Sequence, residues 1–186
     1  MANVDKAIGF RPVKKLDGTP YCGATTRYYV PATDNTAIYV GDPVKLAGSA
    51  DADGVASVTK ASSTDPIVGI VTAVVSVTAQ STTYREASVE RYVEVCNDDQ
   101  VLYEIQEDSD GGALAATDVG LNANFIDGGG STVTGLSGIE LDSSTAATTN
   151  TLDMQIVQIQ VRPDNEIGDN AKVLVKLNNY QYVDGS

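Results

Sequence analysis

Carboxylates are the side chains most able to do chemistry in this chain, because histidine is absent and only two cysteines occur. Two Asp-X-Asp-Gly tetrads, at 51–54 and 108–111, are similar to the start of a calcium-binding loop, in which alternating carboxylates face the ion. Such a loop needs a bidentate glutamate at its twelfth position, where this chain has Ser62 and Val119. We therefore interpret both tetrads as turns between strands and predict no metal site.

Other kinds of catalytic site are also disfavoured. Nucleophilic triads and most zinc sites need histidine or more cysteines than this chain has. The glycine-rich stretch at 128–131 lacks the following lysine of a phosphate-binding loop. Paired carboxylates can hydrolyse glycosides, but the chain has no tryptophan and only two phenylalanines to form sugar-binding platforms. We predict no catalytic residue, no cofactor and no enzymatic activity.

Charge is distributed unevenly along the sequence. The formal net charge is −13, yet residues 1–27 contain five basic and two acidic side chains, a net of +3. The remaining 159 residues contain 7 basic and 23 acidic side chains, a net of −16. Because nucleic acids and anionic lipids select basic surfaces, this balance argues against nucleic acid and against a membrane as partners.

The sequence predicts neither a membrane span nor a secretory signal. The longest apolar run, 66–78, is shorter than the about 18–20 residues of a membrane helix, and the start of the chain lacks the apolar core of a signal peptide. We therefore expect the protein to be made and first retained in the cytosol. In that reducing compartment Cys22 and Cys96 are expected to be free thiols.

Short period-two segments separated by turns predict an all-β protein. Segments 89–95 and 100–107 are predicted to form a hairpin, and a change of apolar phase within 151–161 predicts a β-bulge. We assign the fold as an antiparallel β-sandwich or barrel, jelly-roll-like, with an extended N-terminal arm. Strands are expected at 26–31, 36–40, 44–47, 55–60, 66–77, 89–95, 100–107, 151–161 and 171–183.

The domain organisation follows from the turn residues. Residues 1–27 contain two prolines and three glycines, and we predict that they form the extended basic arm, with one tight turn at Asp17–Gly18. Residues 28–186 are expected to form a single β domain. Within it, the Gly-, Ser- and Asp-rich segment at about 108–150 is expected to be dominated by loops, with two short strands.

Two regions of the chain carry a resemblance to a known family. The leader GFRPVKKLDGTPYCG is followed by TRYYVPATDNTAIYVGDPVKL, and the last third contains TGLSGIELDSSTAATTNTL and VRPDNEIGDNAKVLVKLNNYQY. These motifs resemble those of small capsid decoration, or cement, proteins encoded by tailed bacteriophages. The middle of the chain is less similar, and none of the family's motifs is catalytic.

The resemblance implies a virion protein, made in the host cytoplasm, on the capsid exterior. Such proteins bind the assembled shell and bridge neighbouring subunits of the major capsid protein. The resemblance also implies a homo-oligomer, with a trimer favoured over a dimer because shells offer many three-fold junctions. The alternative is a receptor- or carbohydrate-binding β module of a phage tail or adhesin.

The predicted partner-binding residues all lie in the N-terminal arm. Its basic side chains are expected to meet acidic patches on the major capsid protein or on a neighbouring copy, while its apolar side chains anchor the contact. The residues are Lys6, Arg11, Val13, Lys14, Lys15, Leu16, Tyr21 and Arg27.

Overall fold

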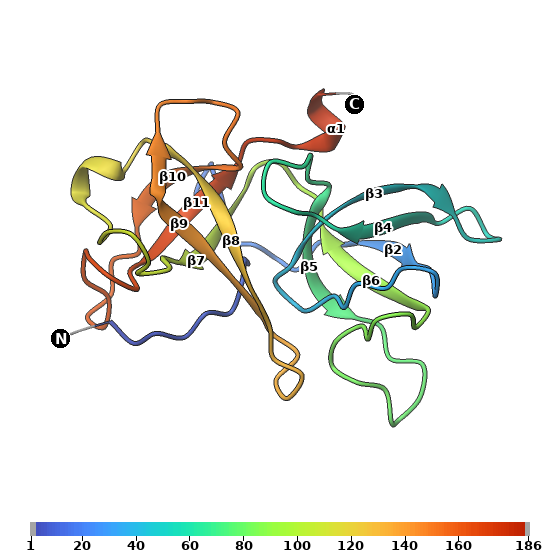
Figure 1. Ribbon diagram of the computed structural model, residues 1–186. Helices are drawn as coiled ribbons and strands as arrows, with labels where there is room; N and C mark the ends of the chain where they lie inside the picture. The colour runs from blue at the N-terminus through green and yellow to red at the C-terminus, as the bar shows by residue number, and fades with distance from the viewer. Residues whose placement is uncertain (1–2, 185–186) are drawn as a thin grey trace.

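Within residues 3–184, which the computed structural model describes, eleven strands form two β bodies that lie side by side (Figure 1). One body is a closed barrel and the other is a curled six-stranded sheet. The prediction of an all-β protein built as a sandwich or barrel is confirmed. Regular helix is confined to the 3-10 turn Ala116–Asp118 and the C-terminal α1 (Gln181–Asp184) in this part of the chain.

The barrel has the strand order β2-β4-β3-β5-β6, and its pairs are antiparallel except for β2 with β4. In β6, Val93 and Val95 face the barrel core, as the alternating sequence predicts, while Tyr92 and Glu94 are less buried. The strands are β2 (Thr26–Val30), β3 (Pro43–Ala50), β4 (Ala56–Lys60), β5 (Gly69–Val74) and β6 (Arg91–Cys96).

The antiparallel sheet has the strand order β1-β7-β11-β10-β8-β9. Glu107, which follows β7, pairs with Leu141 of β9, so the sheet curls around its own core. The strands are β1 (Arg11–Lys15), β7 (Val101–Gln106), β8 (Asn122–Gly130), β9 (Ser137–Ala147), β10 (Met154–Ile159) and β11 (Lys172–Leu177).

Two local predictions have opposite outcomes. The register between β10 and β11 shifts between Ile156 and Gln158, which confirms the predicted bulge. The predicted hairpin of 89–95 with 100–107 is wrong, because β6 pairs within the barrel and β7 pairs with β1 and β11 in the sheet. Since β7 is buried along its whole length, it needs a strand on each side, and the chain between β6 and β7 becomes a crossing between the two bodies.

The segment at 108–150 is less loop-dominated than expected. It contains two strands, but β8 has nine residues and β9 has 11, which makes them the longest in the described chain. A Cβ added to Gly128 would lie 2.5 Å from the Gly138 carbonyl oxygen, so glycine here allows two backbones to approach closely. The small residues, which on their own favour loops, thus allow β8 and β9 to form a tight hairpin. Its tip projects downward in Figure 1.

A separate N-terminal arm is not confirmed. Residues 11–15 form β1, which pairs with β7. Phe10 is 2% exposed, and its ring meets the rings of Tyr103 and Phe125 edge-on, with centroids 6.2 and 5.9 Å apart. Burial of this aromatic side chain stabilises the docked segment over a free one.

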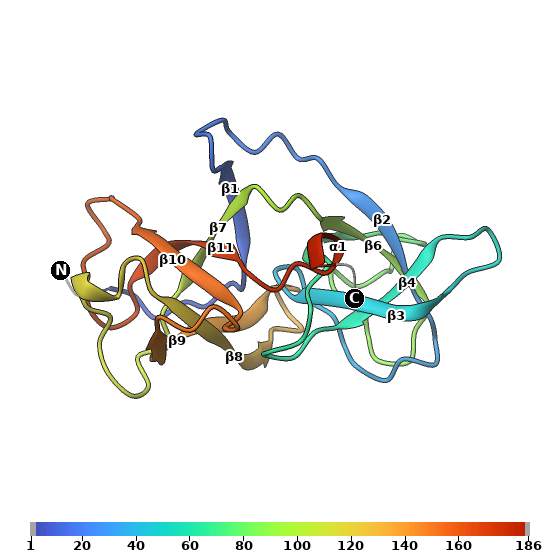
Figure 2. The same ribbon diagram turned by 90° about the horizontal axis from the view of Figure 1, so that it is seen from above.

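The turn predicted inside the leader is present. The Lys15 amide donates to the Thr19 carbonyl at 2.7 Å, and the Gly18 amide donates to the Lys15 carbonyl at 2.9 Å. Figure 2 shows this hairpin standing at the rim of the sheet, from which the chain crosses to β2 of the barrel. The leader is therefore a structural link between the two bodies.

The bodies meet at a close backbone contact between Gly9, Gly41 and Ser137. The Phe10 amide donates to the Gly41 carbonyl at 3.0 Å. Both glycines have positive φ, 68° and 101°. A Cβ on Gly9 would lie 2.6 Å from the Ser137 Cβ, and a Cβ on Gly41 would lie 2.6 Å from the Ile8 carbonyl oxygen. Glycine is needed at both positions for conformation and for space.

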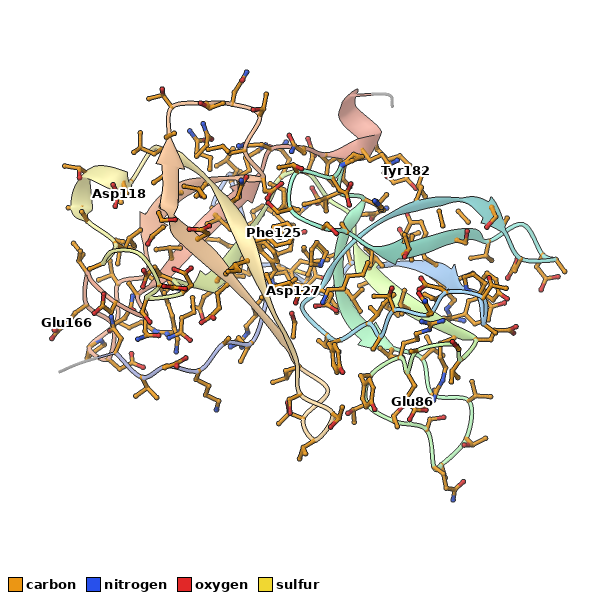
Figure 3. The ribbon with its side chains drawn as sticks, viewed as in Figure 1. Glu86, Asp118, Phe125, Asp127, Glu166 and Tyr182 are labelled. Atoms are coloured by element: carbon orange, nitrogen blue, oxygen red, sulfur yellow. The ribbon has the colours of Figure 1, made fainter. Side chains whose placement is uncertain are left out.

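An ion pair network also spans the junction. The Lys60 ammonium lies 2.7 Å from Asp127 of β8 and 3.4 Å from Asp42, which is fully buried before β3. Burial raises the pKa of Asp42, and the nearby Lys60 charge opposes that rise. Figure 3 shows Asp127 at the boundary between the bodies. In addition, Ile67 and Ile70 of the barrel side belong to the core of the sheet.

We expect Gly9→Ala to lower the free energy of unfolding by about 3 kcal/mol, because its methyl group meets Ser137 at a positive φ. Gly23→Ala is the matched control, since its φ is 80° but nothing lies within 4 Å of the new Cβ. It should cost about 1 kcal/mol. Urea unfolding followed by circular dichroism measures both changes, and equal losses would contradict the proposed junction.

Candidate partner-binding groove

Sheet geometry gathers polar side chains on the outer face of β1, β7 and β11. Arg11 of β1 is the cross-strand partner of Glu104, and Lys172 of β11 is the partner of Gln106. Side chains alternate along a strand, and the intervening residues of β7 and β11 belong to the core. These four residues therefore share the face that points away from the core.

Glu104 is the buried anchor of this face, with 5% of its surface exposed. Its Oε2 accepts hydrogen bonds from Arg162 Nη1 at 3.1 Å and from Gln160 Nε2 at 3.0 Å. Arg162 Nε also lies 3.4 Å from Asp164 Oδ1. The guanidinium charge of Arg162 is thus matched by two carboxylates.

The N-terminal segment is held across the same face by Gln106, which is 2% exposed. The Lys6 amide donates to Gln106 Oε1 at 2.8 Å. Gln106 Nε2 donates to the carbonyls of Val4 at 2.8 Å and Asn170 at 2.9 Å. One buried side chain amide therefore fixes the backbone at residues 4 and 6.

Three adjoining hollows follow residues 6–12, and we call them together the N-terminal groove. They share Ile8 and have volumes of about 390, 370 and 330 Å³. The apolar end is formed mainly by Ile8, Phe10, Pro12, Tyr21, Val71 and Leu136. The basic end is formed by Lys6, Arg11, Glu104, Arg162, Asp164 and Lys172, beside Ile8.

The groove collects only part of the predicted partner-binding set. Lys6 and Arg11 are exposed and line its basic end, and the half-buried Tyr21 lines its apolar end. Neither Lys6 nor Arg11 forms an ion pair within residues 3–184. Outside the lining lie Val13 and Lys14, half-buried on β1, and Leu16, which is 51% exposed.

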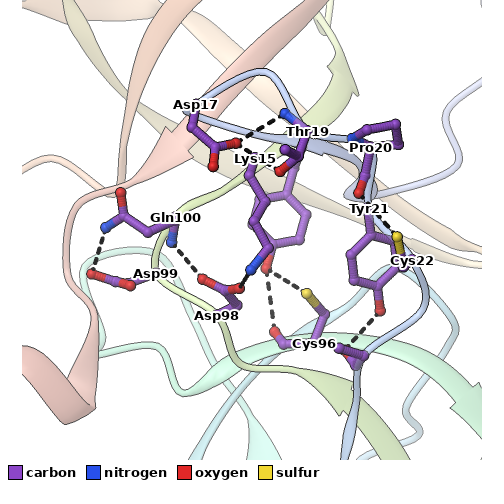
Figure 4. A network of polar contacts seen from close by, with 12 residues as sticks. Lys15, Asp17, Thr19, Pro20, Tyr21, Cys22, Cys96, Asp98, Asp99 and Gln100 are labelled. Atoms are coloured by element: carbon purple, nitrogen blue, oxygen red, sulfur yellow. Dashed lines mark hydrogen bonds and ion pairs between the residues drawn. The ribbon is translucent and has the colours of Figure 1, made fainter.

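Two of the predicted basic residues are already paired within the chain. Lys15 Nζ lies 2.6 Å from Asp98 Oδ2, and this contact, seen in Figure 4, raises the pKa of Lys15 and lowers that of Asp98. Arg27 Nε lies 2.8 Å from Glu94 Oε1 on the barrel. The positive charges of residues 1–27 therefore do not form one patch but lie at separate positions on the fold.

Sequence reasoning missed Arg162 and Lys172. They are far from the leader in sequence and lie on either side of a turn that Asn165 closes. Asn165 Nδ2 donates to the carbonyls of Gln160 at 2.7 Å and Lys172 at 2.9 Å. The only local signal was that these two cations flank the acidic turn PDNEIGD.

Several carboxylates gather around Glu140 of β9. Burial is the main cause that raises the pKa of Glu140 to about 7, and the charges of Asp5, Asp108 and Glu107 contribute to the same rise. Glu107 is fully buried and accepts hydrogen bonds from the Ser143 hydroxyl at 2.8 Å and the Asn170 amide at 2.6 Å. The stability of this cluster should therefore depend on pH.

The two Asp-X-Asp-Gly tetrads serve as turns. Asp51 Oδ1 accepts from the amides of Asp53 at 2.9 Å and Val55 at 2.8 Å, and Asp108 Oδ1 accepts from the Asp110 amide at 3.3 Å. Among residues 3–184, no three metal-ligating side chains come together in a way that could hold an ion. In the same range no helix has the length and apolar character to cross a membrane.

The function of the groove has to be inferred from its geometry. No protein-family model, curated protein or solved structure matches this chain. The groove itself offers three cations without ion-pair partners in the described chain, Lys6, Arg11 and Lys172, and an apolar wall beside them. Such an arrangement suits non-covalent binding of an anionic, partly apolar ligand.

We expect Glu140→Gln to raise the melting temperature at about pH 8 and to leave it nearly unchanged at about pH 4. The native pKa of Glu140 is raised above its usual 4.5 to about 7, so the native protein loses stability as pH rises through this interval. Glutamine stays neutral and avoids that loss. Thermal unfolding of Glu86→Gln, a half-buried glutamate outside this cluster, is the control. An equal effect of Glu140→Gln at both pH values would refute the cluster.

Proposed function

We propose that this protein decorates the outside of a tailed-phage capsid and stabilises it by bridging neighbouring subunits of the major capsid protein. The support begins with the resemblance of residues 9–46, 134–152 and 161–182 to capsid decoration proteins. The first two of these segments meet at the junction of Gly9, Gly41 and Ser137, and the third contributes Arg162 and Lys172 to the groove beside Arg11. That meeting is the observation on which the proposal depends.

The architecture is consistent with such a role. A bridging protein must keep its contact surfaces at a fixed spacing, and here two β bodies share a core, backbone hydrogen bonds and the Lys60 ion pairs. The segments that resemble decoration proteins therefore form part of the rigid framework that would keep the contact surfaces at a fixed spacing. The protein would be made in the host cytoplasm and act on the virion exterior.

Copies of the protein are proposed to associate on the shell, with a trimer favoured. Closed symmetric oligomers fit the three-fold junctions of a shell. Exposed apolar side chains at projecting turns, such as Val133 at 89% and Val77 at 72%, provide contact points for neighbours. Both lie in the loops that extend below the bodies in Figure 1.

Copy number in purified phage particles tests the proposal. Quantitative mass spectrometry against the major capsid protein should find the chain in near-stoichiometric amount, because a decoration protein occupies repeated lattice positions. A few copies per particle would contradict decoration and favour a receptor- or carbohydrate-binding tail module. A tail-tube protein of known copy number in the same digest calibrates the measurement.

Attachment to empty shells should weaken as salt rises. Exposed charges are screened over about 8 Å at physiological ionic strength, and the proposed contact uses the basic leader residues. Co-sedimentation of the full-length protein with shells at low and high salt measures this. Full occupancy at high salt would contradict a charge-based attachment. The full chain is required, because removal of the leader would also remove Phe10 from the core.

A further inference from the structure

The basic end of the N-terminal groove has unbalanced charge in an otherwise acidic protein. Its lining contains four cations and two carboxylates, whereas the whole chain has a net charge of −13. Both carboxylates contact Arg162. Lys6, Arg11 and Lys172 are therefore left without an ion-pair partner among residues 3–184.

The apolar end lies next to these cations. Its hollow of about 390 Å³ is walled by side chains that include Ile8, Tyr21, Val71 and Leu136. Ile8 and Arg11 line both ends, so one short ligand can reach both at once. A ligand for this groove should combine negative charge with one large apolar group.

We propose that the N-terminal groove binds an extended acidic segment of a partner protein, with carboxylates against Lys6, Arg11 and Lys172 and one large apolar side chain in the apolar end. Charge complementarity selects the acidic segment, because the groove is cationic and its surroundings are anionic. The acidic remainder of the protein, whose net charge is −13, would repel a long polyanion such as nucleic acid. A short acidic peptide segment places its negative charges only beside these three cations.

This inference rests on the proposed function for the source of the segment, which would be the major capsid protein. Its chemistry can be tested without any capsid. The structural role of the groove is also separable from binding, because the side chains of Lys6 and Arg11 are exposed and form no hydrogen bond or ion pair within residues 3–184. Lys6 is held through its backbone amide.

The experiment is a fluorescence anisotropy titration at low ionic strength. The probe is a fluorescein-labelled peptide with two glutamates on each side of a single leucine. We expect saturable binding that weakens about tenfold or more in Lys6→Glu/Arg11→Glu. We expect less than about twofold change in Lys176→Glu, which lies on β11 outside the groove and alters the net charge by the same amount as Lys6→Glu alone.

Two further probes test the two ends separately. Replacing leucine by serine should weaken binding through the apolar end, and replacing the glutamates by lysines should abolish it. Equal binding of all three peptides, or equal loss in Lys176→Glu and the groove variant, would overturn the proposal. Lys6→Glu alone serves as the second variant if the double change unfolds the protein, which circular dichroism reveals.

The remaining outcomes distinguish binding of a partner segment from self-association and from shell decoration. If the peptide does not bind and the groove variant dissociates a homo-oligomer in size-exclusion chromatography, a second copy occupies the groove and the partner-segment proposal is overturned. Peptide binding together with a low copy number in particles would retain the groove and reject shell decoration. No peptide binding at near-stoichiometric copy number would reject the groove and retain decoration.

Discussion

The close approach of Gly9, Gly41 and Ser137 is the constraint on which the rest of this structure depends. It sets the N-terminal segment directly against the barrel on one side and β9 on the other, with no room for a Cβ on either glycine. Once that contact is made, Phe10 enters the core of the sheet and β1 continues along β7. Two β bodies thereby become one framework.

Docking of the leader also decides what its charges can do. Lys15 and Arg27 become surface ion pairs of the protein itself, and such pairs contribute little to stability. Lys6 and Arg11 instead meet Lys172, from the other end of the chain, in the N-terminal groove. The groove thus collects cations in a protein whose net charge is −13.

Local chemistry in the sequence determined the class of fold and several of its details. Alternating apolar residues such as Val93 and Val95 require a strand with one buried face. The change of apolar phase near Ile156 requires a bulge, since a side chain can change faces only where the register shifts. The Asp17–Gly18 turn follows from backbone preferences that act within a few residues.

Only the tertiary structure decided which strands pair and which charges meet. The hairpin expected from β6 and β7 does not form, because β6 pairs with β2 and β7 pairs with β11, which are far away in the sequence. Local periodicity carries no information about such long-range contacts. Arg85 shows the same limit: it lies between the predicted strands 66–77 and 89–95, yet it is fully buried and donates to four backbone carbonyls. The groove likewise needs Lys6 and Lys172 to meet, because long-range packing, unlike turn and strand preference, is a property of the whole chain.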